Sequence, residues 1–304
     1  MSLADLGEDA LIRRITRGIR VGSSVLRGIG DDCAVLSGSG RMLQLFASDM
    51  LVEGVHFLRG TAAEAVGWKA LAVNVSDVAA MGGLPRHAVI SLGLPRRARV
   101  AWVDGLYRGL RRCAARFGVN LVGGDTVRAP CAVIAVAILG EAERGRVVFR
   151  GGARAGDWLL VTGKLGGSLK SGRHLRFMPR VQEARALAAR GRLHAMMDLS
   201  DGLWADLPRL CRASGVSAVL EPQRIPRHSG CSLREALTDG EDFELLIAAP
   251  EPEARRLLRW AQGNLACGLH RIGEVVRRRP GGAVRLLLPE GTRPPGALRP
   301  FHHF

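Results

Sequence analysis

Two hydrophobic patterns alternate along this chain, and the alternation limits what it can fold into. Apolar residues recur with the spacing of one helix face in six segments, and short apolar runs typical of strands lie between them. The helical segments are 6–19, 63–81, 100–117, 180–190, 203–213 and 252–260. The strand-like runs are 42–47, 88–94, 121–122, 132–139, 158–162, 218–220, 243–248 and 283–288. Strands and helices that alternate in this way predict an α/β (α+β) fold.

The length predicts two domains, because 304 residues exceed the usual domain size of about 100–200 residues. The best boundary is the Gly- and Arg-rich connection 150–157, so the predicted domains are 1–149 and 150–304. The longest uninterrupted apolar run covers only residues 131–139, whereas a membrane helix needs about 20. The acidic first residues do not resemble a secretory signal, so we expect a cytoplasmic location and no membrane partner.

The chain carries a net charge of +16, from 44 Lys and Arg against 28 Asp and Glu. Such an excess is typical of nucleic-acid-binding proteins. The cations are nearly all arginines, however, and they spread along helical segments such as 108–116 without interleaved aromatic residues. We therefore expect no dedicated nucleic-acid partner, and a phosphate-rich small substrate is the better use of the charge. The six cysteines include no Cys-x-x-Cys pair, which argues against zinc.

The aspartates carry the chemical signal. Several lie beside glycine or serine at the ends of apolar runs, in segments 28–32, 48–49, 76–77, 123–126 and 198–202. Any one of these pairs is explained equally well as a turn or a helix cap, but five segments share the same chemistry. Asp77 lies inside an apolar, alanine-rich helix, where a carboxylate needs a partner. Clustered carboxylates without a His and Cys ligand set favour a hard cation, with Mg²⁺ the first candidate.

A magnesium site of this kind suggests phosphoryl transfer on a nucleotide. The usual phosphate-binding loop is absent, because Gly163 and Lys164 are followed by Leu165 rather than by Ser or Thr. The motif set of protein kinases is absent as well. The remaining class is an acid-rich, multi-metal nucleotide site.

Seven ordered segments resemble the bacterial thiamine-monophosphate kinases, a family of the aminoimidazole-ribonucleotide-synthetase-like superfamily. They are 28–36, 48–57, 69–82, 122–126, 198–203, 240–245 and the final pair 303–304, and together they extend over almost the whole chain. The stretch Met50-Leu-Val-Glu-Gly-Val-His-Phe57 indicates this member of the superfamily. The resemblance implies an N-terminal ATP- and Mg²⁺-binding domain whose sheet forms a barrel across a homodimer. A C-terminal α/β domain would complete the nucleotide and substrate site.

The reaction implied by the resemblance is phosphorylation of thiamine monophosphate by ATP to give thiamine diphosphate. The implied Mg²⁺ ligands are Asp32, Ser48, Asp49, Asp77, Asp125, Asp198 and Asp201, with Asp31 as a weaker candidate. The residues expected to act in catalysis are Asp49, Asp77, Asp125 and Asp201. The implied nucleotide contacts are Gly124, Asp125, Arg150 and Ser200. The implied contacts of thiamine monophosphate are His56, Glu241 and Phe301.

These roles agree with the chemistry, because phosphoryl transfer through a loose transition state needs positioning and charge neutralisation more than a nucleophile. Arg150 can bind phosphate oxygens with two hydrogen bonds, and the thiazolium ring suits the face of Phe301. Each residue also has a plain structural explanation. His56 can be a structural histidine, Glu241 a solvated acid, Phe301 a core residue and Arg150 a surface cation.

The chain departs from the family pattern in places. Ala47 replaces a hydroxyl residue, Asp239 replaces a glycine, Phe243 replaces a common tyrosine and Phe301 stands in for Trp or Tyr. The stretch 168–179 is shortened, and its basic part either covers phosphates or is a solvated turn. Two alternative functions therefore stay open. One is a superfamily enzyme with another phosphorylated or carboxylated acceptor, and the other is a non-catalytic scaffold that binds ATP or nucleic acid.

Overall fold

The fold was analysed in a computed structural model that describes residues 2–279, 282–288 and 298. The chain forms two compact units that are not simply its two halves. The first unit comprises residues 1–31, 149–169 and 191–304, and the second comprises 32–148 and 170–190. The division expected after residue 149 falls next to one passage between the units. Because the chain passes between them at three further points, no single cut describes them. Within the described ranges, no helix has the length and apolar character needed to cross a membrane.

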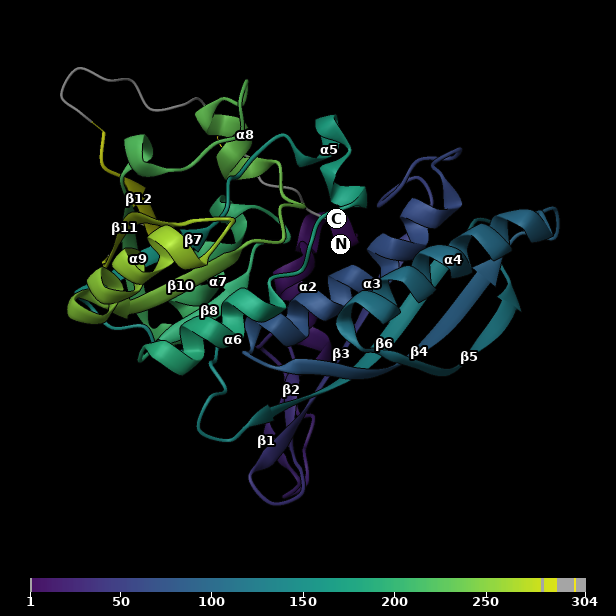
Figure 1. The fold of residues 1–304 in the computed structure, drawn as a ribbon, viewed down its shortest axis with the longest axis horizontal. Coiled ribbons are helices and arrows are strands. Elements are labelled where there is room, and N and C mark those ends of the chain that lie inside the picture. The colour runs from purple at the N-terminus through teal and green to yellow at the C-terminus, as the bar shows by residue number, and fades with distance from the viewer. Residues whose placement is uncertain (1, 280–281, 289–297, 299–304) are drawn as a thin grey trace. The chain divides into compact units, whose positions relative to one another are not determined.

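The second unit is a mixed sheet covered on one face by two long helices (Figure 1). Its strands, in spatial order, are β2 (Ala34–Ser37), β3 (Met42–Val52), β6 (Val133–Glu143), β4 (Leu84–Leu94) and β5 (Asn120–Arg128). Only β4 and β5 are parallel; the other neighbours are antiparallel. The covering helices are α3 (Ala63–Ala80) and α4 (Val100–Phe117). The segment 170–190 adds a short 3₁₀ turn, η1 (Arg173–Leu175), and α6 (Val181–Arg190).

Helices α3 and α4 approach each other closely because glycines lie at the contact. A Cβ atom on Gly67 would lie 1.9 Å from the carbonyl oxygen of Leu106, and one on Gly109 would lie 1.9 Å from that of Glu64. Fourteen of the eighteen residues of α3 are buried. A helix that is apolar on nearly all sides is stable only when neighbours cover all of it, and the two glycines let α4 cover one side.

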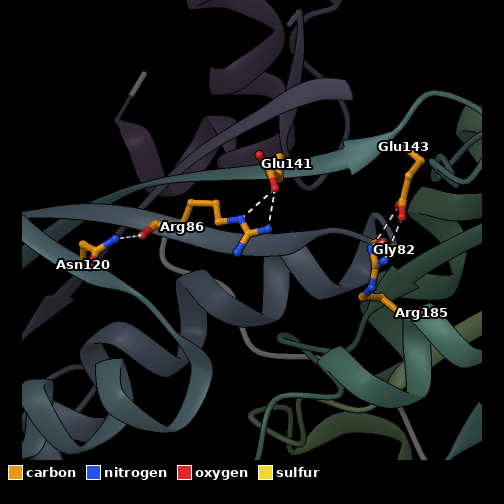
Figure 2. A network of polar contacts seen from close by, with 6 residues as sticks. All are labelled: Gly82, Arg86, Asn120, Glu141, Glu143 and Arg185. Carbon is orange, nitrogen blue, oxygen red and sulfur yellow. Dashed lines mark hydrogen bonds and ion pairs between the residues drawn. The ribbon is translucent and has the colours of Figure 1, made fainter. Parts of the chain in front are cut away.

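Polar contacts fasten the segment 170–190 to the second unit (Figure 2). The Arg185 guanidinium donates to both carboxylate oxygens of Glu143, at 2.9 and 3.1 Å, and to the carbonyl of Gly82 at 3.3 Å. The Trp68 indole Nε1 donates to the carbonyl of Phe177 at 2.9 Å. These contacts explain why a segment from the C-terminal half of the sequence belongs to this unit.

A second network in the same view joins neighbouring strands (Figure 2). Arg86 on β4 donates to Glu141 on β6 at 2.8 Å, and Asn120 on β5 donates to the carbonyl of Arg86 at 3.3 Å. These side-chain bonds add to the backbone ladders of the sheet.

The first unit is built on a six-stranded mixed sheet. Its spatial order is β12 (Val284–Leu286), β9 (Val216–Leu220), β11 (Leu269–Arg277), β7 (Asp157–Thr162), β10 (Leu245–Pro250) and β8 (Ala195–Asp198). Only β12 and β9 are parallel. Helix α7 (Leu203–Ser214) covers one face and contributes to the main apolar core, whereas α9 (Glu251–Asn264) contacts β7, β10 and β11. The unit also contains η2 (Pro222–Arg224) and α8 (Leu233–Thr238).

The N-terminal segment adds α1 (Leu3–Leu6), α2 (Glu8–Ile15) and β1 (Val25–Arg27) to the first unit. Asp9 of α2 forms ion pairs with two arginines of α7, with Arg212 at 2.8 Å and with Arg209 at 3.8 Å. These pairs tie the first residues of the chain to α7.

The expected mixture of strands and helices is confirmed, and the helix expected over 100–117 is α4 itself. Other bounds differ. The helix expected over 6–19 ends at Ile15, and the strand expected over 42–47 continues to Val52. Strand β5 likewise extends beyond the expected strand 121–122 and includes residues 123–126. Glycine and aspartate disfavour strands in isolation, but pairing with β4 outweighs that preference here.

We expect Gly109→Ala to destabilise the protein by about 1–3 kcal/mol or more, because the added methyl group must separate α3 from α4. Gly263→Ala in α9 is the matched control, since its Cβ would meet no atom within 4 Å. That variant should gain about 0.5–1 kcal/mol from reduced chain entropy. Urea unfolding of both variants measures the two effects, and equal stabilities would contradict the close contact.

We expect Arg185→Met to reduce stability at neutral pH and to matter less in acid. Hydrogen bonds from Arg185 are the main cause that lowers the pKa of Glu143 from 4.5 to about 2. A carboxyl group whose pKa is lowered on folding adds stability above its unfolded pKa and loses it as pH falls through the folded value. The difference between wild type and variant should therefore shrink between about pH 4.5 and 2. Arg255→Met, which breaks an exposed ion pair with Glu251, should change stability little at any pH.

Candidate functional site

In the second unit, two of the predicted metal-binding carboxylates lie close together. Asp32 precedes β2 by two residues, Asp77 lies near the end of α3, and carboxylate oxygens of the two are within 4.8 Å of each other. Two carboxylates at this distance repel each other unless a cation is shared. Their hard oxygen donors fit Mg²⁺. Asp32 is therefore the acid that would share a cation with Asp77 in this unit.

Asn74 fixes α3 against β3 beside this pair. Its side-chain oxygen accepts a hydrogen bond from the backbone N–H of Asp49 at 3.0 Å, and its Nδ2 donates to the carbonyl of Ala70 at 3.0 Å. Residues three apart on a helix share a face, so Asp77 lies one turn beyond Asn74 on the side of α3 that meets β3. Asn74, which the sequence did not single out, thus ties the backbone of Asp49 to the helix that carries Asp77.

Ser48 and Asp125 lie elsewhere in the second unit. Along β3 the buried and exposed residues alternate, so Ser48 lies on the opposite face of the strand from Asp49. The Ser48 hydroxyl donates to the carbonyl of Val136 at 3.0 Å. Asp125 is exposed on β5, which β6 and β4 separate from β3. The structure therefore does not bring these two side chains to Asp49.

Gly124 lies where only glycine fits. Its φ is +156°, and a Cβ atom there would lie 1.8 Å from the carbonyl oxygen of Ile90 on β4. The neighbouring Asp125 accepts a hydrogen bond from the Thr126 N–H at 2.8 Å. The backbone at this point is bare and exposed, as a close approach to a nucleotide phosphate requires.

His56 has a defined tautomer. Its Nδ1 accepts a hydrogen bond from the backbone N–H of Val52 at 3.0 Å, so the proton of the neutral ring lies on Nε2. The same loop forms one wall of a cavity of about 890 Å³. Its lining includes apolar and aromatic side chains (Phe57, Leu58 and Trp102), arginines 59, 97 and 99, and one acid, Glu53. The cavity therefore combines aromatic surface with positive charge.

In the first unit, two non-glycine residues, separated by a single residue, adopt left-handed backbone conformations. Glu241 has φ 58° and Phe243 has φ 51°. The Glu241 N–H donates to the carbonyl of Ser200 at 2.6 Å, and the Phe243 N–H donates to that of Leu199 at 2.8 Å. The Ser168 hydroxyl donates to the carbonyl of Glu241 at 2.6 Å. Backbone strain of this kind persists only where surrounding contacts impose it, and it gathers at functional sites.

The loop after β8 holds three predicted residues. Asp198 ends the strand and is buried, and the carbonyl of Ser200 is the acceptor for Glu241. Asp201 forms a very short ion pair with Arg209, and the backbone N–H of Asp201 donates to Asp206 at 3.0 Å. Any metal bound by Asp201 would share that carboxylate with Arg209.

Asp206 is a buried acid that the sequence did not single out. Arg209 donates to its Oδ1 at 2.8 Å. The pKa of Asp206 is raised to about 7, mainly by burial and also by the charge of Asp201, while Arg209 opposes both effects. One arginine thus balances two neighbouring carboxyl groups.

Asp31 and Arg150 interact with each other. The backbone N–H of Arg150 donates to Asp31 Oδ1 at 3.0 Å, and Arg27 lies 3.9 Å from the same carboxylate. The Asp31 side chain is almost completely buried, so its evident role is to hold the chain at residue 150.

One departure from the family pattern, Asp239, has a structural explanation. Asp239 ends α8 with φ −68°, so the position does not require glycine, and its carboxylate accepts a hydrogen bond from the Gly167 N–H at 2.9 Å. Phe243 is buried. Phe301, expected to contact thiamine monophosphate, lies outside the described residues.

Comparison with known proteins identifies close relatives. Residues 30–142 match the N-terminal domain of AIR synthase related proteins, and residues 154–285 match the C-terminal domain. A thiamine-monophosphate kinase of Synechococcus elongatus is 33% identical over 100% of this chain and 98% of its own length. That of Aquifex aeolicus is 37% identical over 83% and 88%. The solved structure of "AaThiL complexed with AMPPCP and TMP" has a TM-score of 0.85 and 34% identity, covering 100% of this chain and 99% of that one. These likenesses confirm the expected two-domain α/β fold.

Replacing Glu241 in two ways separates its backbone from its carboxylate. Glu241→Gly removes the side chain and relieves the left-handed conformation, whereas Glu241→Ala removes the carboxylate and keeps the strain. We expect the Gly variant to be more stable than the Ala variant by about 1 kcal/mol. Thermal and urea unfolding compare the two, and an Ala variant as stable as the Gly variant would show that position 241 is not strained.

Proposed function

This chain belongs to the thiamine-monophosphate kinase family of AIR synthase related proteins, and we propose that it transfers the γ-phosphoryl group of ATP to thiamine monophosphate. The products are thiamine diphosphate and ADP. The observation that carries the proposal is the full-length likeness to a relative solved with AMPPCP and TMP together. The close pair of Asp32 and Asp77 supports it, because two carboxylates can hold a Mg²⁺ ion. Transfer between two phosphates needs the positive charge that such an ion supplies.

The chain's carboxylates would hold Mg²⁺ ions. In the second unit the proposed ligands are Asp32, Asp49 and Asp77, with Ser48 and Asp125 in the roles that the family resemblance implies. In the first unit they are Asp198 and Asp201. When bound, Mg²⁺ neutralises the phosphate oxygens and reduces the repulsion between the two anions. Asp49, Asp77, Asp125 and Asp201 are the residues we propose for catalysis.

The remaining residues bind and orient the two substrates. For the nucleotide, the bare backbone at Gly124 gives close approach, and Arg150 and Ser200 contact phosphate. For the acceptor, His56 offers its Nε2–H as a donor, since Nδ1 is bonded to Val52. Glu241 supplies a negative charge for the cationic thiazolium. In-line transfer then depends on how firmly these groups are held.

The cavity beside His56 supports an acceptor of this chemical class. Its aromatic and apolar residues suit the two rings of thiamine, and its arginines suit an anionic group. We propose that part of thiamine monophosphate occupies it. Its volume of about 890 Å³ falls within the usual range of ligand sites.

We also propose that the protein acts as a cytoplasmic homodimer. The face of the second unit's sheet that α3 and α4 leave open carries exposed apolar side chains, among them Phe46 and Met50 of β3, which are 48% and 54% exposed. Val122 on the edge strand β5 is 59% exposed. Exposed apolar side chains on an uncovered sheet are typical of an interface, and a second copy of the same sheet would close it into a barrel.

The proposed activity is tested by incubating the protein with ATP, MgCl₂ and thiamine monophosphate, and separating the products by chromatography. Thiamine diphosphate and ADP should appear in equal amounts and only when Mg²⁺ is present. Turnover of ATP without thiamine diphosphate would indicate another acceptor. Salt-dependent nucleic-acid binding without ATP turnover would favour a scaffold.

We expect Asp77→Asn to lower kcat by about a hundredfold or more, because it removes charge at a metal site while keeping the volume. Asp104→Asn, on the exposed surface of α4, is the matched control and should keep full activity. Circular dichroism of both variants checks that they fold. Wild-type turnover by folded Asp77→Asn would contradict the proposed metal site.

A further inference from the structure

Lys69 is completely buried, although lysine is among the residues most rarely buried. It lies in the middle of α3, among apolar side chains. Its ammonium group donates to the carbonyl oxygen of His56 at 2.8 Å and lies 3.0 Å from Nδ1 of His174. Removing an ammonium group from water costs several kcal/mol unless it is hydrogen-bonded. These two contacts help to compensate the charge for its removal from water.

The two contacts join parts of the second unit that are far apart in sequence. His56 belongs to the loop after β3, and His174 lies in η1, within the basic segment 170–176. The neighbouring Trp68 bonds to Phe177, just beyond that segment. Two consecutive residues of α3 thus hold the basic segment, and Lys69 also holds the loop of His56.

His174 is suited to accept a hydrogen bond from an ammonium group. The ring is buried, and burial, with the nearby charge of Lys69, lowers its pKa to about 4. At neutral pH the ring is therefore uncharged, and Nδ1 can act as an acceptor. The contact does not bring two positive charges together.

His56 is held at two points. Lys69 fixes its carbonyl group, and the N–H of Val52 fixes its ring at Nδ1. The direction of the Nε2–H bond is then set by these contacts. Because a donor must be aimed to within about 10–20° to bind a substrate well, the buried lysine controls a property of the acceptor site without touching the acceptor.

We propose that Lys69 is a positioning residue for the acceptor: it aims His56 and couples it to the basic segment 170–176. This inference rests on the proposed function, since it assigns the consequence to binding of thiamine monophosphate. The basic segment, which the sequence left as either a phosphate cover or a solvated turn, is on this account part of the acceptor side of the protein. ATP binding does not depend on Lys69.

The test compares Lys69→Met, Lys69→Arg and the control Lys164→Met, which removes an exposed lysine. We expect Lys69→Met to raise the KM for thiamine monophosphate about tenfold or more while the KM for ATP stays within about twofold. Lys69→Arg should recover part of the loss, and Lys164→Met should resemble the wild type. An unchanged KM for thiamine monophosphate in folded Lys69→Met would overturn the proposal. An equal rise in both KM values, with a lower Tm, would show that Lys69 is merely structural.

A second readout does not depend on the reaction. In ¹⁵N spectra of the histidine rings, wild type and Lys164→Met should show His56 as the Nε2–H tautomer, and Lys69→Met should shift the signals of His56 and His174. If the wild type does not phosphorylate thiamine monophosphate, the proposed function fails while these spectra still test the placement. Unshifted signals would disprove it.

If Lys69→Met does not fold, His174→Leu provides the second variant. It removes one acceptor of the ammonium group and leaves the contact with His56. We expect the KM for thiamine monophosphate to rise about threefold or more, with the KM for ATP within about twofold. An unchanged KM for the acceptor would overturn the coupling between His56 and the basic segment.

Discussion

The close contact of α3 with α4 at Gly67 and Gly109 is the constraint on which the second unit depends. Because the two backbones almost touch, α3 is buried along nearly its whole length, and every polar group on it must find a partner inside the protein. Asn74 finds one on β3, Asp77 lies beside Asp32, and Lys69 bonds to His56. The same burial that stabilises the fold therefore sets the positions of the candidate site residues.

The first unit positions its residues by another device. There the loops after β8 and before β10 bond to each other through the backbone, and these bonds hold Glu241 and Phe243 in conformations that isolated residues avoid. In the second unit, the helix sets where its side chains lie. In the first unit, backbone hydrogen bonds between two loops hold individual loop residues in place. The strained loop carries a predicted substrate contact, which agrees with the tendency of strain to accumulate where orientation matters.

Much of the fold and the central acids of the site could be predicted from the sequence. An aspartate in an apolar helix is conspicuous in the sequence, because the carboxylate of Asp77 needs a partner there. Lys69 and Asn74 belong to the same helix but gave no signal, because lysine and asparagine are common on helix surfaces and only the neighbouring elements bury them. Asp206 was not predicted for a similar reason. Its separation of five residues from Asp201 does not indicate that Arg209 bonds to both carboxylates. The strand bounds around Ser48 and Asp125 were missed because strand pairing outweighs local preference.

The two acid pairs of the protein illustrate two ways of stabilising neighbouring carboxylates. Asp201 and Asp206 are bridged by Arg209 from the same helix as Asp206, and the proton affinity of Asp206 is high because burial outweighs that one positive charge. Arginine is a permanent part of the chain, so its charge cannot arrive or depart with a substrate. For Asp32 and Asp77, which meet within 4.8 Å, a divalent cation would supply the same neutralisation, but in a form that can also bind phosphate oxygens. A divalent cation held by oxygen ligands of this kind would make the second unit's pair suitable for the proposed phosphoryl transfer.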